Sequence, residues 1–249
     1  MKNTLKYIAA ILISILLLSS QDDASELLIE DYLRQSGGAN KIEQIKDLTI
    51  KSTLDLNITK FQTVTYFKYP NKILTIYSRR GKEEFRTLLL SNKMLRAFTR
   101  GVVPLLLEGD ANVAKTNLLR SNPFHEFFAE KFQIRSKALS VMMLDHEEPP
   151  YPKPVIPIRF TSGEISWSSY YDIKTKLKVG SVWNIGTQID DISRKEATVE
   201  EFFDFKTFGE LKFPTKIRVS SDSGVYSTTY ISSIEINTNI SDKIFTIER

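Results

Sequence analysis

Side chains able to act as catalysts or metal ligands are few in this sequence. It has two histidines, His125 and His146, and no cysteine. Protein zinc sites commonly combine several histidines or thiolates with carboxylates, and both disulfides and cysteine nucleophiles need cysteine. We therefore expect no metal site and no cofactor, and we interpret both histidines as surface or helix-capping residues.

The acidic residues that stand closest together do not form an evident catalytic pair. Asp190 and Asp191 are neighbours, as are Glu200 and Glu201. Adjacent side chains of a strand point to opposite faces of a sheet, so neither pair would bring two carboxylates to one substrate. The chain also lacks the G-x-S-x-G, P-loop and G-x-G-x-x-G motifs. These absences predict a binding protein with no catalytic residues rather than an enzyme.

The charged residues do not indicate a nucleic-acid partner. There are 34 basic and 30 acidic side chains, and loss of an N-terminal segment containing Lys2 and Lys6 would lower the formal net charge from +4 to +2. A nucleic-acid-binding protein concentrates Lys and Arg on one face. Here the densest basic clusters, at residues 34–51 and 79–82, lie among acidic residues, which is typical of a solvated surface.

The N-terminus has the layout of a secretory signal. Lys2 and Lys6 precede an apolar run at residues 7–18, and two small residues follow. This run of about twelve residues is shorter than the roughly 20 that span a bilayer. We therefore expect residues 1–20 to be a signal peptide and the protein to be periplasmic. The alternative is an uncleaved segment anchored in the inner membrane, because Leu18 falls where a cleavage site favours a small residue.

The rest of the chain must form the scaffold that positions any site. Its dominant pattern is the period of two that is typical of strands. Residues 48–58 alternate apolar and polar side chains, which predicts one dry and one wet face. Further short strands separated by turn signals predict antiparallel hairpins. We expect them at residues 61–69, 72–78, 83–90, 93–99, 158–160, 164–171, 177–183, 198–205, 214–220 and 225–236.

Helices are expected at the start and in the middle of the chain. Residues 24–35 carry a helical apolar stripe that ends at the glycines of Ser36-Gly37-Gly38, and residues 39–46 form a second short piece. In the middle, residues 110–120 read as a helix, and another begins at Pro123. Phe124, Phe127 and Phe128 would share one face of that helix, either as ordinary core or as a mobile lid over a cavity.

Several short motifs resemble the outer-membrane lipoprotein-sorting-like proteins of Gram-negative bacteria, which have the LolA/LolB-like (lipoprotein localisation factor) fold. Ile29-Glu30-Asp31-Tyr32-Leu33-Arg34-Gln35-Ser36-Gly37-Gly38 is similar to the start of these proteins, and the late hairpin with Gly209-Glu210-Leu211-Lys212-Phe213-Pro214 matches theirs closely. The other similar segments are residues 45–53, 69–72, 203–206 and 234–245.

The resemblance implies a mainly β protein with some helix. Its sheet would be a strongly curved antiparallel sheet of about eleven strands, an unclosed β-barrel with helices covering the concave mouth. Residues 21–249 would then form a single half-barrel domain, with a helical lid segment at about 101–132. The lid residues would be Leu105, Leu106, Phe124, Phe127 and Phe128.

The leading functional hypothesis is a non-catalytic periplasmic carrier or sensor of the acyl chains of lipids or lipoproteins. The chains would lie in an apolar concavity, unless the same residues form a filled core. The alternative is a protein-binding regulatory or envelope-assembly factor on the same scaffold. We expect a monomer with no nucleic-acid partner. The predicted cavity lining is Leu48, Ile50, Leu54, Leu56, Val64, Tyr66, Ile217, Val219, Tyr226 and Tyr230.

Overall fold

The structure is a computed structural model that describes residues 24–90, 93–98, 105–109, 111–126, 134–140, 142–144, 153–189, 192–221 and 224–246. The predicted signal peptide lies outside these residues. Among the described residues, no helix is both long and apolar enough to cross a membrane.

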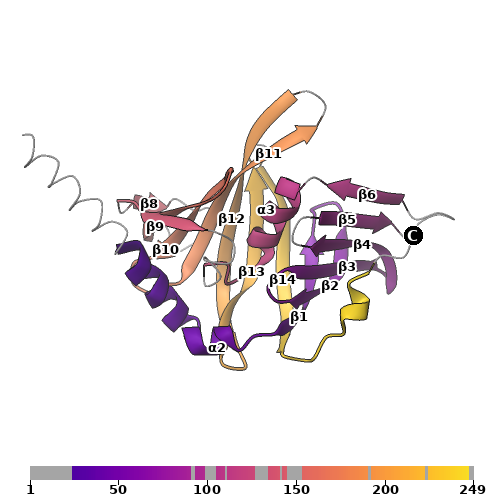
Figure 1. The fold of residues 1–249 in the computed structure, drawn as a ribbon, viewed down its shortest axis with the longest axis horizontal. Helices are drawn as coiled ribbons and strands as arrows, with labels where there is room; N and C mark the ends of the chain where they lie inside the picture. The colour runs from indigo at the N-terminus through magenta and orange to yellow at the C-terminus, as the bar shows by residue number, and fades with distance from the viewer. Residues whose placement is uncertain are drawn as a thin grey trace, which may run out of the picture.

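One antiparallel sheet of fourteen strands contains most of the described chain (Figure 1). Its order is β6-β5-β4-β3-β2-β1-β14-β13-β12-β11-β10-β9-β7, and β8 also pairs with β9. The strands are β1 (Asp47–Asp55), β2 (Lys60–Lys68), β3 (Lys72–Arg79), β4 (Lys82–Leu90), β5 (Lys93–Phe98), β6 (Leu105–Gly109), β7 (Arg135–Ala138), β8 (Met142–Leu144), β9 (Lys153–Ser162), β10 (Ile165–Asp172), β11 (Lys178–Ile189), β12 (Ile192–Phe208), β13 (Leu211–Ser221) and β14 (Gly224–Ile236).

The predicted fold class is confirmed, because the sheet is antiparallel, curved and unclosed, with β6 and β7 at its two edges. The strand number is higher than the expected value of about eleven. The additional strands β6, β7 and β8 have only five, four and three residues. Segments this short contain too few residues to show a period of two, so the sequence pattern does not reveal them.

Helices lie on the concave face of the sheet. The predicted middle helix is α3 (Ala111–Ser121), which contacts β4 and β5 at one limb of the sheet and β11 at the other. Six strands separate β4 from β11 in the sheet order, so a single helix reaches both only because the sheet curves strongly around it. The concave mouth is therefore covered as expected (Figure 1).

The N-terminal helix (residues 24–35) covers another part of this face and is followed by α2 (Ala39–Glu43). Leu28, Tyr32 and Leu33 are buried against the sheet. The glycine-rich end of the helix lies close to the β12–β13 turn, where the Lys212 N–H donates to the Ser36 carbonyl at 2.9 Å. The helix is thus fixed to the sheet at its C-terminal end.

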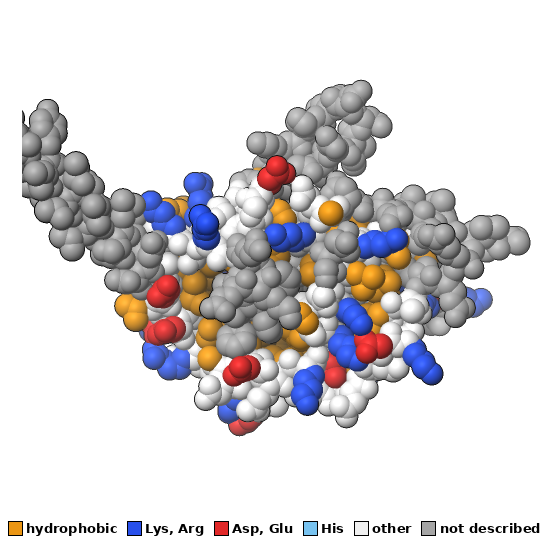
Figure 2. Space-filling model, viewed as in Figure 1, with side chains coloured by type: hydrophobic (Ala, Val, Ile, Leu, Met, Phe, Trp, Pro, Cys, Tyr) orange, Lys and Arg blue, Asp and Glu red, His pale blue; other side chains and the backbone are white. Residues whose placement is uncertain are grey.

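The concavity is filled unevenly. Toward β9–β11, Trp167 stacks on Phe160 and Trp183, with ring centroids 5.3 and 4.7 Å apart, and all three side chains are buried. Toward β1–β3, the same face carries smaller side chains, among them Ser52, Thr63 and Thr65. Hydrophobic side chains gather at the centre of this face, with charged side chains around them (Figure 2).

Candidate functional site

A cavity of about 340 Å³ opens on the concave face between α3 and the strands β1–β3 and β12–β14. This volume is within the range of small-molecule sites, roughly 300–1,000 Å³. We call it the concave cavity. It is lined by Ile50, Ser52, Leu54, Thr63, Thr65, Phe67, Thr75, Tyr77, Asn117, Arg120, Ser121, Glu200, Phe202, Ile217, Val219, Thr229 and Ile231.

One wall of the concave cavity is apolar. Ile50 and Leu54 of β1 stand beside Ile231 and Thr229 of β14, and Ile217 of β13 continues the surface. These side chains share a face because partners in an antiparallel ladder point to the same side of the sheet. The result is a mainly apolar surface that crosses three strands and includes the hydroxyls of Ser52 and Thr229.

The adjoining part of the lining, on β1, β2 and β3, carries hydroxyl groups that bond to one another. Ser52 Oγ lies 2.6 Å from Thr63 Oγ1, and Thr65 Oγ1 lies 3.2 Å from Thr75 Oγ1. Mutual pairing reduces the free-energy cost of excluding water from these groups. An apolar chain can therefore lie against this wall, while the hydroxyls remain able to accept or donate a hydrogen bond to a polar group.

An ion pair lies where α3 meets the cavity. Arg120 Nε donates to Glu200 Oε1 at 2.5 Å, and Trp183 Nε1 donates to Glu200 Oε2 at 3.1 Å. Glu201 instead accepts from Arg218 Nε at 2.6 Å. Register places Glu200 opposite Val219 and Glu201 opposite Arg218, on alternate faces of β12. The two carboxylates therefore do not act together, as strand geometry predicts.

Four residues of the predicted lining, Ile50, Leu54, Ile217 and Val219, do line the concave cavity. Leu48 is on the same face but is fully buried in the core. Leu56 lies in the turn after β1, and the side chain of Tyr226 is outside the described residues.

Val64, Tyr66 and Tyr230 were predicted to line the cavity, and they lie on the opposite face of the sheet. Leu48 pairs with Phe67, which turns Phe67, Thr65 and Thr63 inward and their neighbours outward. Tyr230 pairs with the outward-facing Thr53, and 47% of it is exposed. The apolar pattern of β2 misled the prediction because its inward face is rich in threonine.

The predicted lid residues lie in different parts of the structure. Phe124 is buried and points into the concavity, where its ring centroid is 5.3 Å from that of Phe213. Leu105 and Leu106, the other predicted lid residues, belong to the edge strand β6. Residues 123–126 form a turn, and Phe127 and Phe128 lie outside the described residues.

His125 is wrongly predicted as a surface or capping residue, because it is 2% exposed. Trp167 Nε1 donates to His125 Nε2 at 3.1 Å, so Nδ1 carries the proton of the neutral ring and faces the Asn122 carbonyl at 3.2 Å. Burial lowers the pKa of His125 to about 4, which keeps the imidazole neutral near pH 7. The apolar neighbours Phe124 and Phe127 were the available sequence signal for this burial.

Glu126 is also buried, and sequence analysis missed it. Its Oε1 accepts from the Tyr171 hydroxyl and from Lys178 Nζ, each at 2.9 Å. No partner for Oε2 is found within the described part of the chain. Burial acts to raise the pKa of Glu126, but His125 and Lys178 outweigh it and hold the pKa below its usual value.

These four residues, His125, Glu126, Tyr171 and Lys178, form a buried polar cluster between the N-terminal helix and the strands. The Lys178 ammonium lies 5.5 and 5.8 Å from the ring centroids of Tyr32 and Phe202. Phe202 also lines the concave cavity. The cluster therefore connects residues 122–126 to the inner end of the cavity.

The concave cavity presents several kinds of group that can bind a ligand. Within the described ranges, no three His, Asp or Glu side chains are grouped to hold a metal ion. The groups that face the concave cavity are apolar side chains, paired hydroxyls and one ion pair. Such a surface can bury an apolar chain and orient a polar group attached to it.

Comparison with known proteins identifies the fold. No family model and no curated protein matches the sequence. A crystal structure of a DUF1329-family protein from Desulfovibrio piger is similar, with a TM-score of 0.59 at 11% identity over 89% of this chain and 96% of the other. A LolA-superfamily protein from Nitrosomonas europaea gives a TM-score of 0.57 at 11% identity, over 89% of this chain and 97% of the other. The chain therefore has the LolA/LolB-like fold, as its sequence motifs suggested.

Proposed function

We propose that this protein is an exported, non-catalytic carrier or sensor that binds an acyl chain of a lipid or lipoprotein in the concave cavity. The observation that carries the proposal is the group of apolar side chains Ile50, Leu54, Ile217 and Ile231 beside an open volume of about 340 Å³. The LolA-like fold supports the same interpretation.

The energetics of burial are sufficient for this function. Each CH₂ group removed from water contributes about 0.8 kcal/mol, so an acyl chain of moderate length binds without any strong polar contact. The hydroxyls of Thr65 and Thr75 and the Arg120–Glu200 pair would orient the polar end of the ligand. Binding of this kind is reversible, as a carrier or sensor requires.

Native mass spectrometry of the protein purified from its own cell envelope tests this proposal. We expect a population that carries one acyl-containing lipid, which gentle collisional activation releases. A protein that carries no lipid and binds a stoichiometric protein partner would contradict the carrier proposal. That result would favour a regulatory or envelope-assembly factor on the same scaffold.

A further inference from the structure

A second and larger hollow lies on the opposite face of the sheet. It is a groove of about 670 Å³ between the strands β1–β5 and the C-terminal residues 237–246, which we call the strap. It is lined by Thr49, Tyr66, Leu74, Ile76, Arg86, Ala97, Phe98, Thr238, Ile240, Ser241, Lys243, Ile244 and Thr246. We call it the outer groove, and no residue of the concave cavity takes part in it.

Hydrogen bonds fix the strap where it leaves the sheet. The Asp47 carboxylate accepts from the Thr238 N–H at 2.6 Å, from the Thr238 hydroxyl at 3.1 Å and from the Ile240 N–H at 3.3 Å. Asn237 adds bonds to the Lys46 N–H at 2.7 Å and the Gln44 carbonyl at 2.9 Å. The bonds to the Asp47 carboxylate are charge-assisted, and because Asp47 is buried they are shielded from water.

The far end of the strap is fixed as well. Asp242 accepts from Lys68 Nζ at 2.9 Å and from Lys72 Nζ at 2.7 Å. Beyond it, Phe245 is buried with Leu74 and Leu88 in a small separate core. The strap is thus held at both ends, so the groove beneath it is a built feature of the fold.

The floor of the outer groove is apolar. Leu74 and Ile76 of β3 and Ala97 of β5 come from the sheet, and Ile240 and Ile244 come from the strap. These residues give the groove two apolar sides that could enclose one alkyl chain. The volume of about 670 Å³ is roughly twice that of the concave cavity and lies within the range of ligand sites.

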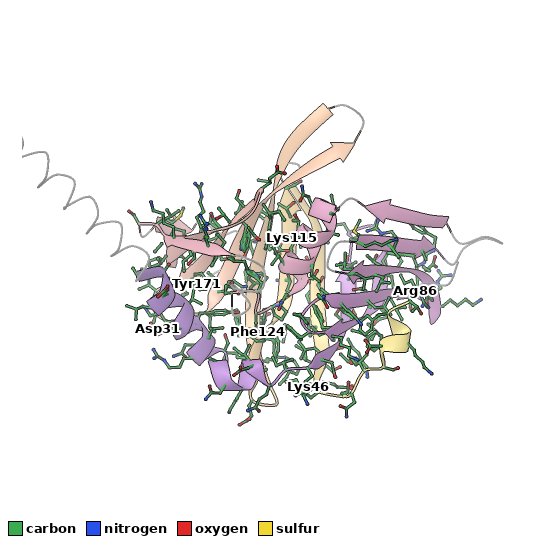
Figure 3. The ribbon with its side chains drawn as sticks, in the orientation of Figure 1. Asp31, Lys46, Arg86, Lys115, Phe124 and Tyr171 are labelled. Carbon is green, nitrogen blue, oxygen red and sulfur yellow. The ribbon has the colours of Figure 1, made fainter. Side chains whose placement is uncertain are left out.

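The rim of the outer groove is more basic than acidic. Arg86 lies on β4, at the limb beside the strap (Figure 3), and is paired in register with Ile76 and Ala97. Its guanidinium donates to both carboxylate oxygens of Glu83 at 2.7 Å. Lys243 is exposed on the strap, and Lys68 and Lys72 share the one carboxylate of Asp242. The charged residues that line the groove, Arg86 and Lys243, are both cations, which favours an anionic group there.

We propose that the outer groove is a second ligand site, which binds one single-chain amphiphile with an anionic head. The alkyl chain lies between the half-buried side chains of Tyr66 and Ile76 on the sheet and of Ile240 and Ile244 on the strap, and the head lies near Arg86 and Lys243. This site is independent of the concave cavity, so the protein holds two ligands on opposite faces of one sheet.

The test uses neighbouring residues of β3 that face opposite sides. Thr75 lines the concave cavity and Ile76 lines the outer groove. Dansyl-undecanoic acid, a fluorescent anionic amphiphile, is titrated into the intact protein, Thr75→Trp, Ile76→Trp and the double variant. We expect two bound probes per wild-type chain, loss of one in each single variant and loss of both in the double variant. Thermal unfolding followed by circular dichroism confirms that each variant is folded, and Ala97→Leu replaces Ile76→Trp if the latter is not.

A separate variant tests the role of the basic residues at the outer groove. Lys243→Glu should weaken the affinity of the outer groove for the anionic probe by about tenfold, equivalent to about 1.4 kcal/mol. The affinity of the concave cavity, which Thr75→Trp blocks, should not change. A probe stoichiometry that Ile76→Trp and Ala97→Leu leave unaltered would overturn the second site. Loss of binding in Ile76→Trp alone, with no effect of Thr75→Trp, would support the outer site and contradict the carrier function of the concave cavity.

Discussion

Glu126 and Lys178 form an ion pair inside the protein. Both side chains are almost completely buried, and one carboxylate oxygen has no partner among the described residues. A buried ion pair often stabilises a protein no better than two packed apolar residues would. Here the pair fixes residues 122–126 against β10 and β11, which positions Phe124 against Phe213.

Removing one partner of this pair should be strongly destabilising. Lys178→Met leaves the Glu126 carboxylate buried without its cation, and we expect the free energy of unfolding to fall by about 3–5 kcal/mol. The double variant Glu126→Leu/Lys178→Met removes both charges and should recover most of this loss. Urea denaturation measures both values. If the single variant lost less than about 1 kcal/mol, the pair would not be buried as described.

The His125 pKa of about 4 predicts that stability falls on acidification. In the unfolded chain the imidazole titrates near 6.5, so between pH 6.5 and 4 the unfolded state binds a proton that the native state does not. The contribution of neutral His125 is complete above pH 6.5 and decreases below it, by at most about 1.4 kcal/mol per pH unit.

His125→Gln is the matched control for this pH dependence, because glutamine can still accept from Trp167 but does not titrate. Urea denaturation near pH 7 and near pH 5 should show a smaller loss of stability in the variant than in the wild type. Equal losses in the two proteins would mean that His125 takes up its proton at the same pH in the native state as in the unfolded chain.

At the scale of elements, the sequence predicts regular strands and helices well and misses the short ones. The alternation in β1 and the length of α3 identified these elements, because each spans several periods of its pattern. Strands β6, β7 and β8 are too short for this signal. The inward face of β2 was misassigned because Thr63 and Thr65, rather than Val64 and Tyr66, complete the register with β1.

The buried polar cluster could not be predicted for a different reason. His125 and Glu126 are brought to Tyr171 and Lys178 by contacts between residues more than 40 positions apart. No local pattern encodes such a contact. The motifs that did indicate the fold, including the glycines after the N-terminal helix, are local turn and hairpin signals.

The end of the N-terminal helix gives a prediction at this scale. Gly37 has a φ of 126°, and an added Cβ would lie 2.6 Å from the Glu210 carbonyl oxygen, whereas Gly38 has a φ of 99° and no heavy atom within 4 Å. Alanine at either position strains the backbone by roughly 1 kcal/mol. Gly37→Ala must also displace the β12–β13 turn and should lose about 1–3 kcal/mol more in urea denaturation. Equal losses would show that the helix end is not packed on this turn.

At the scale of the whole molecule, the sheet combines a filled and an open half. The aromatic stack of Phe160, Trp167 and Trp183 fills the concavity at β9–β11, while small and hydroxyl-bearing residues leave space at β1–β3. The filled half gives stability, and the open half can bind ligand without unfolding the core. Of the predicted lining residues, Ile50, Leu54, Ile217 and Val219 lie at the open half, whereas Leu48 is buried in the core.

Export is a further expectation for the intact chain. The apolar run at residues 7–18 predicts that the mature protein begins near Gln21 or a few residues later. N-terminal sequencing of protein recovered from its own periplasm measures this directly. Recovery of intact Met1 in a membrane fraction would replace the diffusing carrier with a membrane-anchored one.

Acyl-chain binding in the concave cavity is the central claim, and two adjacent threonines of β14 test it most directly. Thr229 lines the cavity, whereas Thr228 pairs with Arg218 on the outer face. The affinity for an uncharged fluorescent monoacylglycerol is measured in Thr229→Trp and in Thr228→Trp, which carry the same change of side chain. Filling the cavity in Thr229→Trp should weaken binding at least about tenfold, a loss of about 1.4 kcal/mol, while Thr228→Trp should bind like the wild type. Equal affinities in the two variants, or no binding by the wild type, would contradict the claim.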